Sequence, residues 1–454
     1  MLLFWTMFYL LFTILLGIYA SRFVKSSGDF ILAGRKLPFS MATATVFATW
    51  FGSETILGAS VEFANHGMQG VIEEPFGAAL GLIIVGLFFA RQFYRKNFIT
   101  FGDFYREQFG KKAESIAAIM IVFSYFGWIA AQMVAMGTVI HMITGINMEM
   151  AIAGSSLLVT FYTWIGGLWA VSLTDSLQMI IIITGLFIAT WFAIPDTGFM
   201  SVIEAAPDGF LNFFPNNTFQ EWIVWTGALL TLGLGSVPQQ DVFQRVMASK
   251  TEKIAVYSSI TAGILYLTIA LIPLYLGLVA KQTLSGTVLS QNLILEIIKQ
   301  KTPLTVQIIF MGALLSAIMS TASGALLAPS SIMSENIIKP LWNKNIQDEL
   351  FLKINRLSVV GIAFFALIMA LYRRNIYDLV AEASAVSLVS LFVPLVSGLF
   401  FKNKNETAAI LSMVFGIFGW LLAVYLETGI PAIFYGLATS STGFTAGIMY
   451  KKFS

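Results

Sequence analysis

The chain has 454 residues, 57% of them hydrophobic and only 11% charged, and its formal net charge is +2. A soluble protein of this length could not keep so much apolar surface from water, so the composition predicts a multi-pass helical membrane protein surrounded by the lipid bilayer. The small net charge argues against nucleic acid as a partner. The absence of cysteine excludes disulfides, thiolate nucleophiles and cysteine metal sites.

Apolar runs of about 20 residues, long enough to cross a bilayer, recur along the whole chain. They predict about thirteen transmembrane spans, with boundaries good to a few residues. The expected spans lie near residues 3–21, 38–65, 71–90, 114–143, 149–168, 174–194, 222–238, 254–280, 303–336, 355–372, 377–400, 407–426 and 430–450. The first run lacks the basic start and small-residue cleavage pattern of a signal peptide, so we expect it to be retained as a span.

Lysine and arginine gather in alternate loops, and loops rich in these residues stay in the cytoplasm. They occur near residues 22–36, 91–112, 245–253 and 402–404 and at the end of the chain, whereas residues 195–221 contain acidic but no basic residues. Arg373 and Arg374 are exceptions, since they fall on the predicted outer side. The bias predicts a protein of the cell (inner or plasma) membrane with its N-terminus outside and its C-terminus in the cytoplasm.

The first polar interruption of an apolar span covers residues 43–60, with the sequence TATVFATWFGSETILGAS. Glu54 is a candidate functional residue, because a carboxylate at membrane depth is costly and usually faces a cavity or a partner. Gly52 and its small polar neighbours weaken the helix at this point. Backbone carbonyls freed there are tolerated only inside protein or bound to a ligand, and sodium is one such ligand.

A second interruption covers residues 312–331, with the sequence GALLSAIMSTASGALLAPSS. Ala317, Ser320 and Thr321 are spaced by three and four residues, so one carbonyl and two hydroxyls can converge on one side of a helix. Oxygen ligands in this arrangement suit a hard cation. The alternative is that small residues let membrane helices approach closely, and taken alone the stretch favours that interpretation.

Other polar residues have simpler interpretations. Glu73 and Glu74, directly before Pro75, are expected at the outer mouth of the protein, as gate residues or as a solvated loop end. Gln132 lies one turn after Trp128, where it either lines a pocket or makes an interhelical hydrogen bond.

Four segments resemble the sodium:solute symporter family. In chain order they are ATWFGSETILG (48–58), TWIGGLWAVSLTDSLQ (163–178), GSVPQQDVFQRVMASK (235–250) and ALLSAIMSTASGALLAPSSIMSENI (313–337). They resemble the family's broken first core helix, its GG-L-x-AV-x-x-TD-x-x-Q signature, its P-x-Q-x-x-x-QR cytoplasmic turn and its sodium-site helix. The matches keep the family's order over nearly the whole chain. Several are most similar to the branch that contains high-affinity choline transporters and many bacterial relatives.

The resemblance implies an all-α polytopic membrane protein with the LeuT-type fold, an inverted repeat of five plus five helices. It implies an extra N-terminal helix and cytoplasmic loop over 1–37, a first repeat with its outer loop over 38–221, an inverted second repeat over 222–405 and two additional helices over 406–454. The first helix of each repeat is then broken at mid-membrane, where such transporters bind solute and ion. Gly233, Gly235 and Pro238 support the second break, because proline lacks an amide donor and glycine loosens the backbone.

Carried over residue by residue, the resemblance implies a main sodium site. Its ligands would be the carbonyls of Ala48, Phe51 and Ala317 and the hydroxyls of Ser320 and Thr321. Some members have a second sodium site, for which Asp175 and Ser323 match, although Gly324 stands where those members have a further serine. Asp175 has the alternative role of capping the helix that begins near it. Sodium is the only metal ion expected, and no organic cofactor is implied.

The resemblance also implies a solute pocket. The matched residues are Trp50, Gly52, Glu54, Thr55, Ala78, Trp128, Gln132 and Gln239. Glu54 and Thr55 match pocket positions of the sugar and sialic-acid branches. The two tryptophans match aromatic positions of the choline branch, where an aromatic ring attracts an ammonium group.

The pocket departs from the choline branch at other aromatic positions, where this chain has Ala78, Gln239 and Val380. The aromatic cage is therefore incomplete. A glutamate with two tryptophans still favours a cationic or zwitterionic solute, such as an amine or an amino acid.

These features predict a sodium-coupled symporter that imports a small organic solute by alternating access. The chain is not expected to be an enzyme, because no nucleophile, metal cluster or nucleotide motif stands out in it. Glu54 leaves proton coupling as the main alternative among transporters. A sensor that binds solute without moving it is the alternative outside them.

Overall fold

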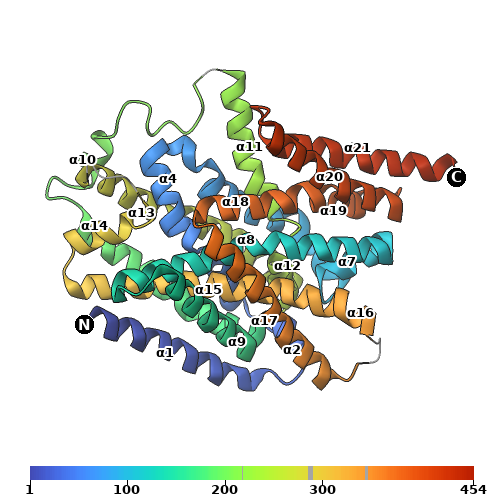
Figure 1. The fold of residues 1–454 in the computed structure, drawn as a ribbon, viewed down its shortest axis with the longest axis horizontal. Coiled ribbons are helices and arrows are strands. Elements are labelled where there is room, and N and C mark those ends of the chain that lie inside the picture. Colours follow the sequence, from blue (N-terminus) through green and yellow to red (C-terminus); the bar gives the residue numbers. More distant parts are fainter. Residues whose placement is uncertain (217, 285–289, 343–345, 454) are drawn as a thin grey trace.

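The structure is a computed structural model that describes residues 1–216, 218–284, 290–342 and 346–453. Most of its long helices run along the long axis of the molecule (Figure 1). The first half contains α1 (Leu2–Ala20), α2 (Ser27–Leu32), α3 (Phe39–Trp50), α4 (Ala59–His66), α5 (Ala78–Ile84), α6 (Ala90–Lys96), α7 (Phe101–Phe109), α8 (Lys111–Thr144), α9 (Met148–Ala193) and α10 (Phe199–Glu204). The second half contains α11 (Phe219–Gly235), α12 (Gln240–Ala248), α13 (Glu252–Thr283), α14 (Leu293–Lys301), α15 (Leu304–Ile332), α16 (Lys339–Trp342), α17 (Asp348–Tyr372), α18 (Ile376–Ser387), α19 (Val393–Phe400), α20 (Glu406–Leu426) and α21 (Ala432–Phe453).

Short 3₁₀ or π-helical turns join several of these helices. They are η1 (Ser21–Phe23), η2 (Ala33–Arg35), η3 (Glu54–Gly58), η4 (Met68–Val71), η5 (Ile72–Gly77), η6 (Val85–Phe89), η7 (Met333–Ile338) and η8 (Leu388–Phe392).

Within the described residues, nine helical segments are long and apolar enough to cross a membrane. The remaining expected spans are also helical, but they differ in form. Those near 38–65 and 222–238 are each interrupted, and the one near 430–450 corresponds to α21. The two expected near 149–168 and 174–194 form the single long helix α9, which kinks at Gly167. Gly167 has φ +53°, a conformation that glycine adopts without strain, and this angle turns the chain between the two spans.

The central helices are surrounded by others that expose apolar side chains. Helix α15 packs against α9, α8 and α3, and α13 packs against α3, α4 and α5. Helix α1 lies along one edge of the molecule, and the pair α20 and α21 lies at another (Figure 1). Large apolar side chains such as Phe8, Leu11 and Phe418 point outward from these edge helices. Such surfaces suit contact with lipid.

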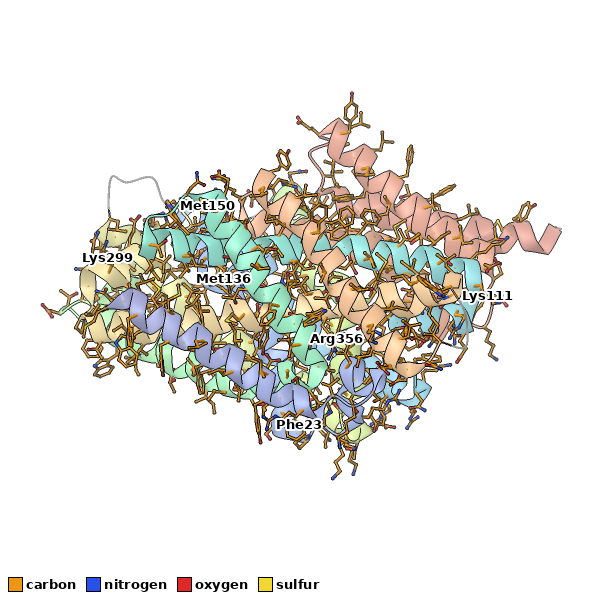
Figure 2. The ribbon with its side chains drawn as sticks, turned by 60° about the horizontal axis from the view of Figure 1, so that its bottom comes forward. Phe23, Lys111, Met136, Met150, Lys299 and Arg356 are labelled. Atoms are coloured by element: carbon orange, nitrogen blue, oxygen red, sulfur yellow. The ribbon has the colours of Figure 1, made fainter. Side chains whose placement is uncertain are left out.

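The two ends of the bundle are marked by Lys111 and by Met150 and Lys299, which lie at opposite ends of the long axis (Figure 2). Lys111 begins α8, and Met150 stands in the first turn of α9, where the chain has returned to the other end.

Candidate functional site

The first predicted break lies between α3 and η3. Helix α3 ends at Trp50, and Phe51 has non-helical angles of φ −81° and ψ 75°. The Gly52 amide donates to the Trp50 carbonyl at 3.0 Å, so it turns away from the Ala48 carbonyl, which would be its helical partner. Thr321 of α15 donates its hydroxyl to that carbonyl at 3.3 Å. The predicted break is confirmed, and a freed carbonyl faces the second polar stretch.

The second predicted break lies between α11 and α12 and is also confirmed. Helix α11 ends at Gly235, and the chain turns through Pro238 before α12 begins at Gln240. The two breaks meet directly, because the Trp50 indole donates to Asp241 of α12 at 2.7 Å. Two interrupted helices thus touch in the middle of the protein, as expected where solute and ion bind.

The residues predicted for the main sodium site lie on packed elements. Ala48 and Phe51 belong to the end of α3, and Ala317, Ser320 and Thr321 belong to α15, which packs against α3. All five are buried. The structure joins Thr321 to Ala48, while the Ser320 hydroxyl donates to an Asp175 carboxylate oxygen at 2.6 Å. Hydroxyl and carbonyl oxygens of this kind fit a sodium ion as co-transported substrate.

Asp175 does not cap a helix, so that alternative is wrong. It lies within α9, well past the kink at Gly167, and it is fully buried. Its carboxylate accepts hydrogen bonds from the hydroxyls of Ser320 and Thr45 rather than from backbone amides. Ser323 instead donates to the Ser320 carbonyl at 3.0 Å. Ser320 therefore connects the residues predicted for the two sodium sites.

Gly324, which departs from the family pattern, makes room for the buried side chain of Arg245. A Cβ atom at this position would lie 2.5 Å from Nη2 of Arg245 and 2.8 Å from the Thr49 methyl carbon. Arg245 is only 1% exposed, and its guanidinium donates to Thr49 at 2.8 and 3.1 Å and to the Asp241 carbonyl at 3.2 Å. Arg245, which belongs to a loop predicted to be cytoplasmic, is thus part of the protein interior.

Replacing Gly324 by alanine is expected to destabilise the protein by about 1–3 kcal/mol, because the new methyl group displaces a hydrogen-bonded guanidinium from a packed interior. The measurement is the thermal unfolding midpoint in detergent. Gly312→Ala is the matched control on the same helix, since its Cβ would meet nothing within 4 Å. That variant should be neutral or slightly stabilised, because alanine favours a helix over glycine. Equal effects at both positions would contradict the assigned role of Gly324.

A narrow cavity lies between the two breaks. Four of the predicted solute-binding residues line it: Trp50, Glu54, Trp128 and Gln239. Its free volume is about 10 Å³, close to the space of a single water molecule. The central cavity is therefore almost closed in this structure.

The other four predicted solute residues do not line this cavity but support residues near it. Gln132 donates to Glu54 at 2.7 Å and accepts from the Ser53 amide at 3.1 Å. A Cβ atom on Gly52 would lie 2.5 Å from the Glu54 carboxylate. Thr55 donates to Glu74 at 2.8 Å, and Ala78 is buried at the start of α5.

Glu74 corrects an expectation from the sequence. It is 2% exposed and lines the central cavity, instead of lying in a solvated loop or at the outer mouth. Its backbone is extended, with φ −132° and ψ 114°, which interrupts η5 directly before Pro75. Residues that precede proline favour this conformation, so the Glu-Glu-Pro sequence at the start of an apolar run was the available signal.

Tyr266 and Asp241 are two further site residues that the sequence analysis missed. Tyr266 of α13 donates to the Trp50 carbonyl at 3.0 Å and to Glu74. Asp241 accepts from Trp50 and from the Tyr125 hydroxyl. Both join the end of α3 to helices far away in the sequence, so no local sequence pattern predicted their role.

The charge of this region is strongly unbalanced. Its buried carboxylates are Glu54, Glu74, Asp175 and Asp241, and among the described residues Arg245 is the only arginine or lysine in the buried class. Ionised groups inside a membrane protein are costly unless they are paired. The excess of carboxylates therefore makes the region suited to bind cations.

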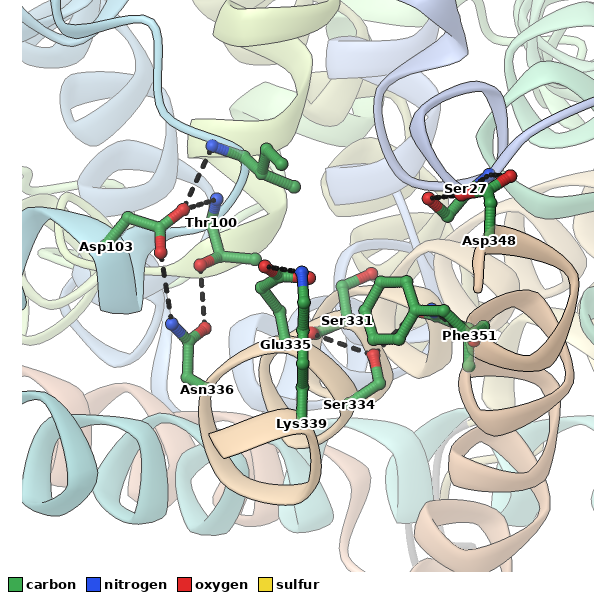
Figure 3. Close-up of polar contacts among 12 residues, drawn as sticks. Ser27, Thr100, Asp103, Ser331, Ser334, Glu335, Asn336, Lys339, Asp348 and Phe351 are labelled. Atoms are coloured by element: carbon green, nitrogen blue, oxygen red, sulfur yellow. Dashed lines mark hydrogen bonds and ion pairs between the residues drawn. The ribbon is translucent and has the colours of Figure 1, made fainter. Parts of the chain in front are cut away.

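The two ends of the protein differ in how they close this region. At the end that carries Lys111, Asn336 of η7 accepts from the Thr100 hydroxyl at 2.7 Å and donates to Glu114 of α8 at 2.8 Å and to Asp103 of α7 at 3.4 Å. Figure 3 shows Thr100, Asp103 and Asn336 in this buried network. At the opposite end, a cavity of about 640 Å³ is lined by residues that include Glu62, His141 and Tyr377. Its size and position suit an entrance vestibule.

Comparison with known proteins agrees with this geometry. Residues 30–416 match the family model described as "Sodium:solute symporter family". The human high affinity choline transporter 1 is 30% identical over 94% of this chain and 77% of its own length. The sodium/glucose cotransporter of Vibrio parahaemolyticus is 24% identical over 90% of this chain and 81% of its own length.

Solved structures show the same fold. A sodium-coupled sialic acid symporter in a substrate-bound outward-open state superimposes with a TM-score of 0.85 at 21% identity, over 100% of this chain and 98% of that one. A nucleobase-cation-symport-1 family transporter in a closed conformation gives a TM-score of 0.58 at 14% identity, over 94% and 95% of the two chains. The predicted all-α LeuT-type membrane fold is thereby confirmed, and the matched family consists of transporters rather than enzymes. The family match extends over most of the chain, so this multi-pass membrane protein belongs to the sodium:solute symporter family.

Proposed function

We propose that this protein imports a small cationic or zwitterionic organic solute together with sodium, by alternating access. The observation that carries the proposal is the meeting of the two helix breaks beside four buried carboxylates, with one buried guanidinium among the residues that the structure describes. A cationic solute and sodium would supply the charge that this region needs. There are two alternatives. The transporter could be coupled to protons instead of sodium, or the protein could be a sensor that binds the solute without transporting it.

The proposed main sodium site consists of Ala48, Phe51, Ala317, Ser320 and Thr321, and the proposed second site consists of Asp175 and Ser323. The freed Ala48 carbonyl and its contact with Thr321 support the first. Sodium there would join α3 to α15 across the first break. The Asp175 carboxylate, already bonded to Ser320, supports the second by placing a negative charge beside the first.

The proposed solute site is the central cavity with its supporting residues, the eight predicted from the sequence. The domain boundaries at 37, 221 and 405 and the cytoplasmic C-terminus are part of the same proposal. The end that carries Lys111 would then face the cytoplasm, because Lys111 belongs to the stretch 91–112, which is rich in lysine and arginine. In this structure the buried Asn336 network closes that end.

Sodium-dependent binding provides the test. Purified protein is heated with amines, amino acids, betaines, choline, sugars and carboxylates, in sodium chloride or in potassium chloride. A solute at 100 times its Kd stabilises by about 2.7 kcal/mol, which is readily measured as a shift in the unfolding midpoint. We expect a cationic or zwitterionic solute to stabilise only with sodium, and to accumulate in proteoliposomes under an inward sodium gradient.

Other results would identify the alternatives. Stabilisation that depends on pH and is indifferent to sodium would replace sodium by protons. Saturable binding without accumulation in proteoliposomes would indicate a sensor. Stabilisation only by sugars or carboxylates would overturn the solute class.

A further inference from the structure

Glu74 lines the central cavity, and one of its two carboxylate oxygens has no hydrogen-bond donor among the described residues. Its Oε1 atom accepts from the Thr55 hydroxyl at 2.8 Å and from the Tyr266 hydroxyl. Its Oε2 atom is buried and has no hydrogen-bond partner within the part of the chain that the structure describes. A buried carboxylate oxygen without a donor costs free energy, so a ligand that supplies a donor would be bound favourably.

The neighbouring carboxylate differs in this respect. Both oxygens of Glu54 are engaged, one by the Trp128 indole at 3.0 Å and the other by the Gln132 amide at 2.7 Å. Each Glu54 oxygen thus already has one donor, whereas one Glu74 oxygen has none and has more to gain from a donor on the solute.

The remaining walls do not suit an ammonium group that lacks N–H bonds. Trp50 and Trp128 meet edge to face, with ring centroids 6.1 Å apart, and each indole N–H is already bonded to a carboxylate. Tyr266 adds a third ring to the lining, but the rest of it is not aromatic and consists of Leu232, Ser236, Gln239, Val380, Ala383 and Ser384 beside the two glutamates. A quaternary ammonium binds best when aromatic faces surround it.

We propose that Glu74 makes this transporter selective for a protonated amine that carries N–H bonds, a primary or secondary amine, over a quaternary ammonium compound. The inference rests on the proposed function and names the solute class more narrowly. The amine would donate to the free Glu74 oxygen, while the Glu54 charge and the tryptophan rings hold its positive charge.

The experiment uses two series that differ only in N-methylation. One runs from 2-aminoethanol through its mono- and dimethyl forms to choline, and the other runs from glycine to glycine betaine. Binding to the wild-type protein is measured in sodium by thermal stabilisation and titration calorimetry. In whichever series binds, we expect affinity to fall by at least about tenfold from the primary amine to the quaternary compound, the effect of losing one charge-assisted hydrogen bond.

Substitutions of Glu74 and of its neighbour Glu73 test whether Glu74 causes the preference for the primary amine. In Glu74→Gln the preference for the primary amine should shrink to within about threefold. Glu74→Asp, which keeps the carboxylate, should retain part of the preference. Glu73→Gln is the matched control, since this neighbouring carboxyl also has a buried oxygen without a partner among the described residues but does not line the cavity; it should keep the wild-type preference.

Several outcomes overturn the inference and leave sodium symport intact. One is sodium-dependent binding of choline or betaine at least as tight as that of the parent amine. Another is a preference that survives in Glu74→Gln. Sodium-dependent binding confined to solutes without an amine would likewise reject the amine class alone, whereas failure of every solute to bind with sodium would reject the proposed function itself.

Discussion

The Ser320→Ala variant is expected to bind sodium much more weakly than the wild-type protein. The Ser320 hydroxyl is a proposed sodium ligand, and it also donates to Asp175 at 2.6 Å. Its removal takes one oxygen from the main site and leaves a buried carboxylate short of a donor. Hydrogen bonds to charged groups contribute about 1.5–3 kcal/mol, so sodium affinity should fall by at least about tenfold. The measurement is the sodium concentration that gives half-maximal stabilisation of the protein by sodium alone.

Ser330→Ala is the control for this variant. Ser330 is a buried serine of the same helix, and its hydroxyl donates to the Leu326 carbonyl at 2.6 Å within α15. The Ser330→Ala variant should leave the sodium concentration for half-maximal stabilisation unchanged. If Ser320→Ala also left it unchanged, the coupling ion would bind elsewhere. If the variant bound sodium normally but lost its response to solute, Ser320 would act on the solute site through Asp175.

The backbone breaks could be predicted from the sequence because their causes are local. Gly52 and its polar neighbours interrupt α3, and Pro238 with the preceding glycines ends α11. Glycine and proline act on their own stretch of chain, so their effect is visible without knowledge of the fold. Local sequence signals do not predict that Ala48 and Thr321 lie together, and this expectation came from the family resemblance.

The environment of the charged residues could not be predicted in the same way. Arg245 and Asp241 belong to a stretch with lysines that was expected in a cytoplasmic loop, but tertiary packing buries both. Glu74 was expected at the outer mouth, but Thr55 and Tyr266 hold it in the interior. Tyr266 lies 211 residues from Thr55 in the sequence, and no periodicity links such distant positions.

The Asp241→Ala variant is expected to lower stability more than any other single change discussed above, by about 3–5 kcal/mol, because it breaks a buried charged network. Asp241 accepts from the Trp50 indole of the first break and from Tyr125 of α8. Without it, two buried donors lose their acceptor, and Arg245 stays buried with one carboxylate fewer nearby. The measurement is the unfolding midpoint at fixed sodium and detergent concentrations.

Two variants separate the charge of Asp241 from its hydrogen bonds. Asp241→Asn keeps one acceptor oxygen for Trp50 but removes the charge, and Tyr125→Phe keeps the charge but removes one donor. If the unpaired donors cause most of the loss, Asp241→Asn should recover more than half of it. If the buried Arg245 charge causes it, Asp241→Asn should be nearly as unstable as Asp241→Ala, while Tyr125→Phe stays close to the wild type. A wild-type midpoint for Asp241→Ala would show that the Trp50–Asp241 contact does not hold the two breaks together, because nothing would then be lost by removing it.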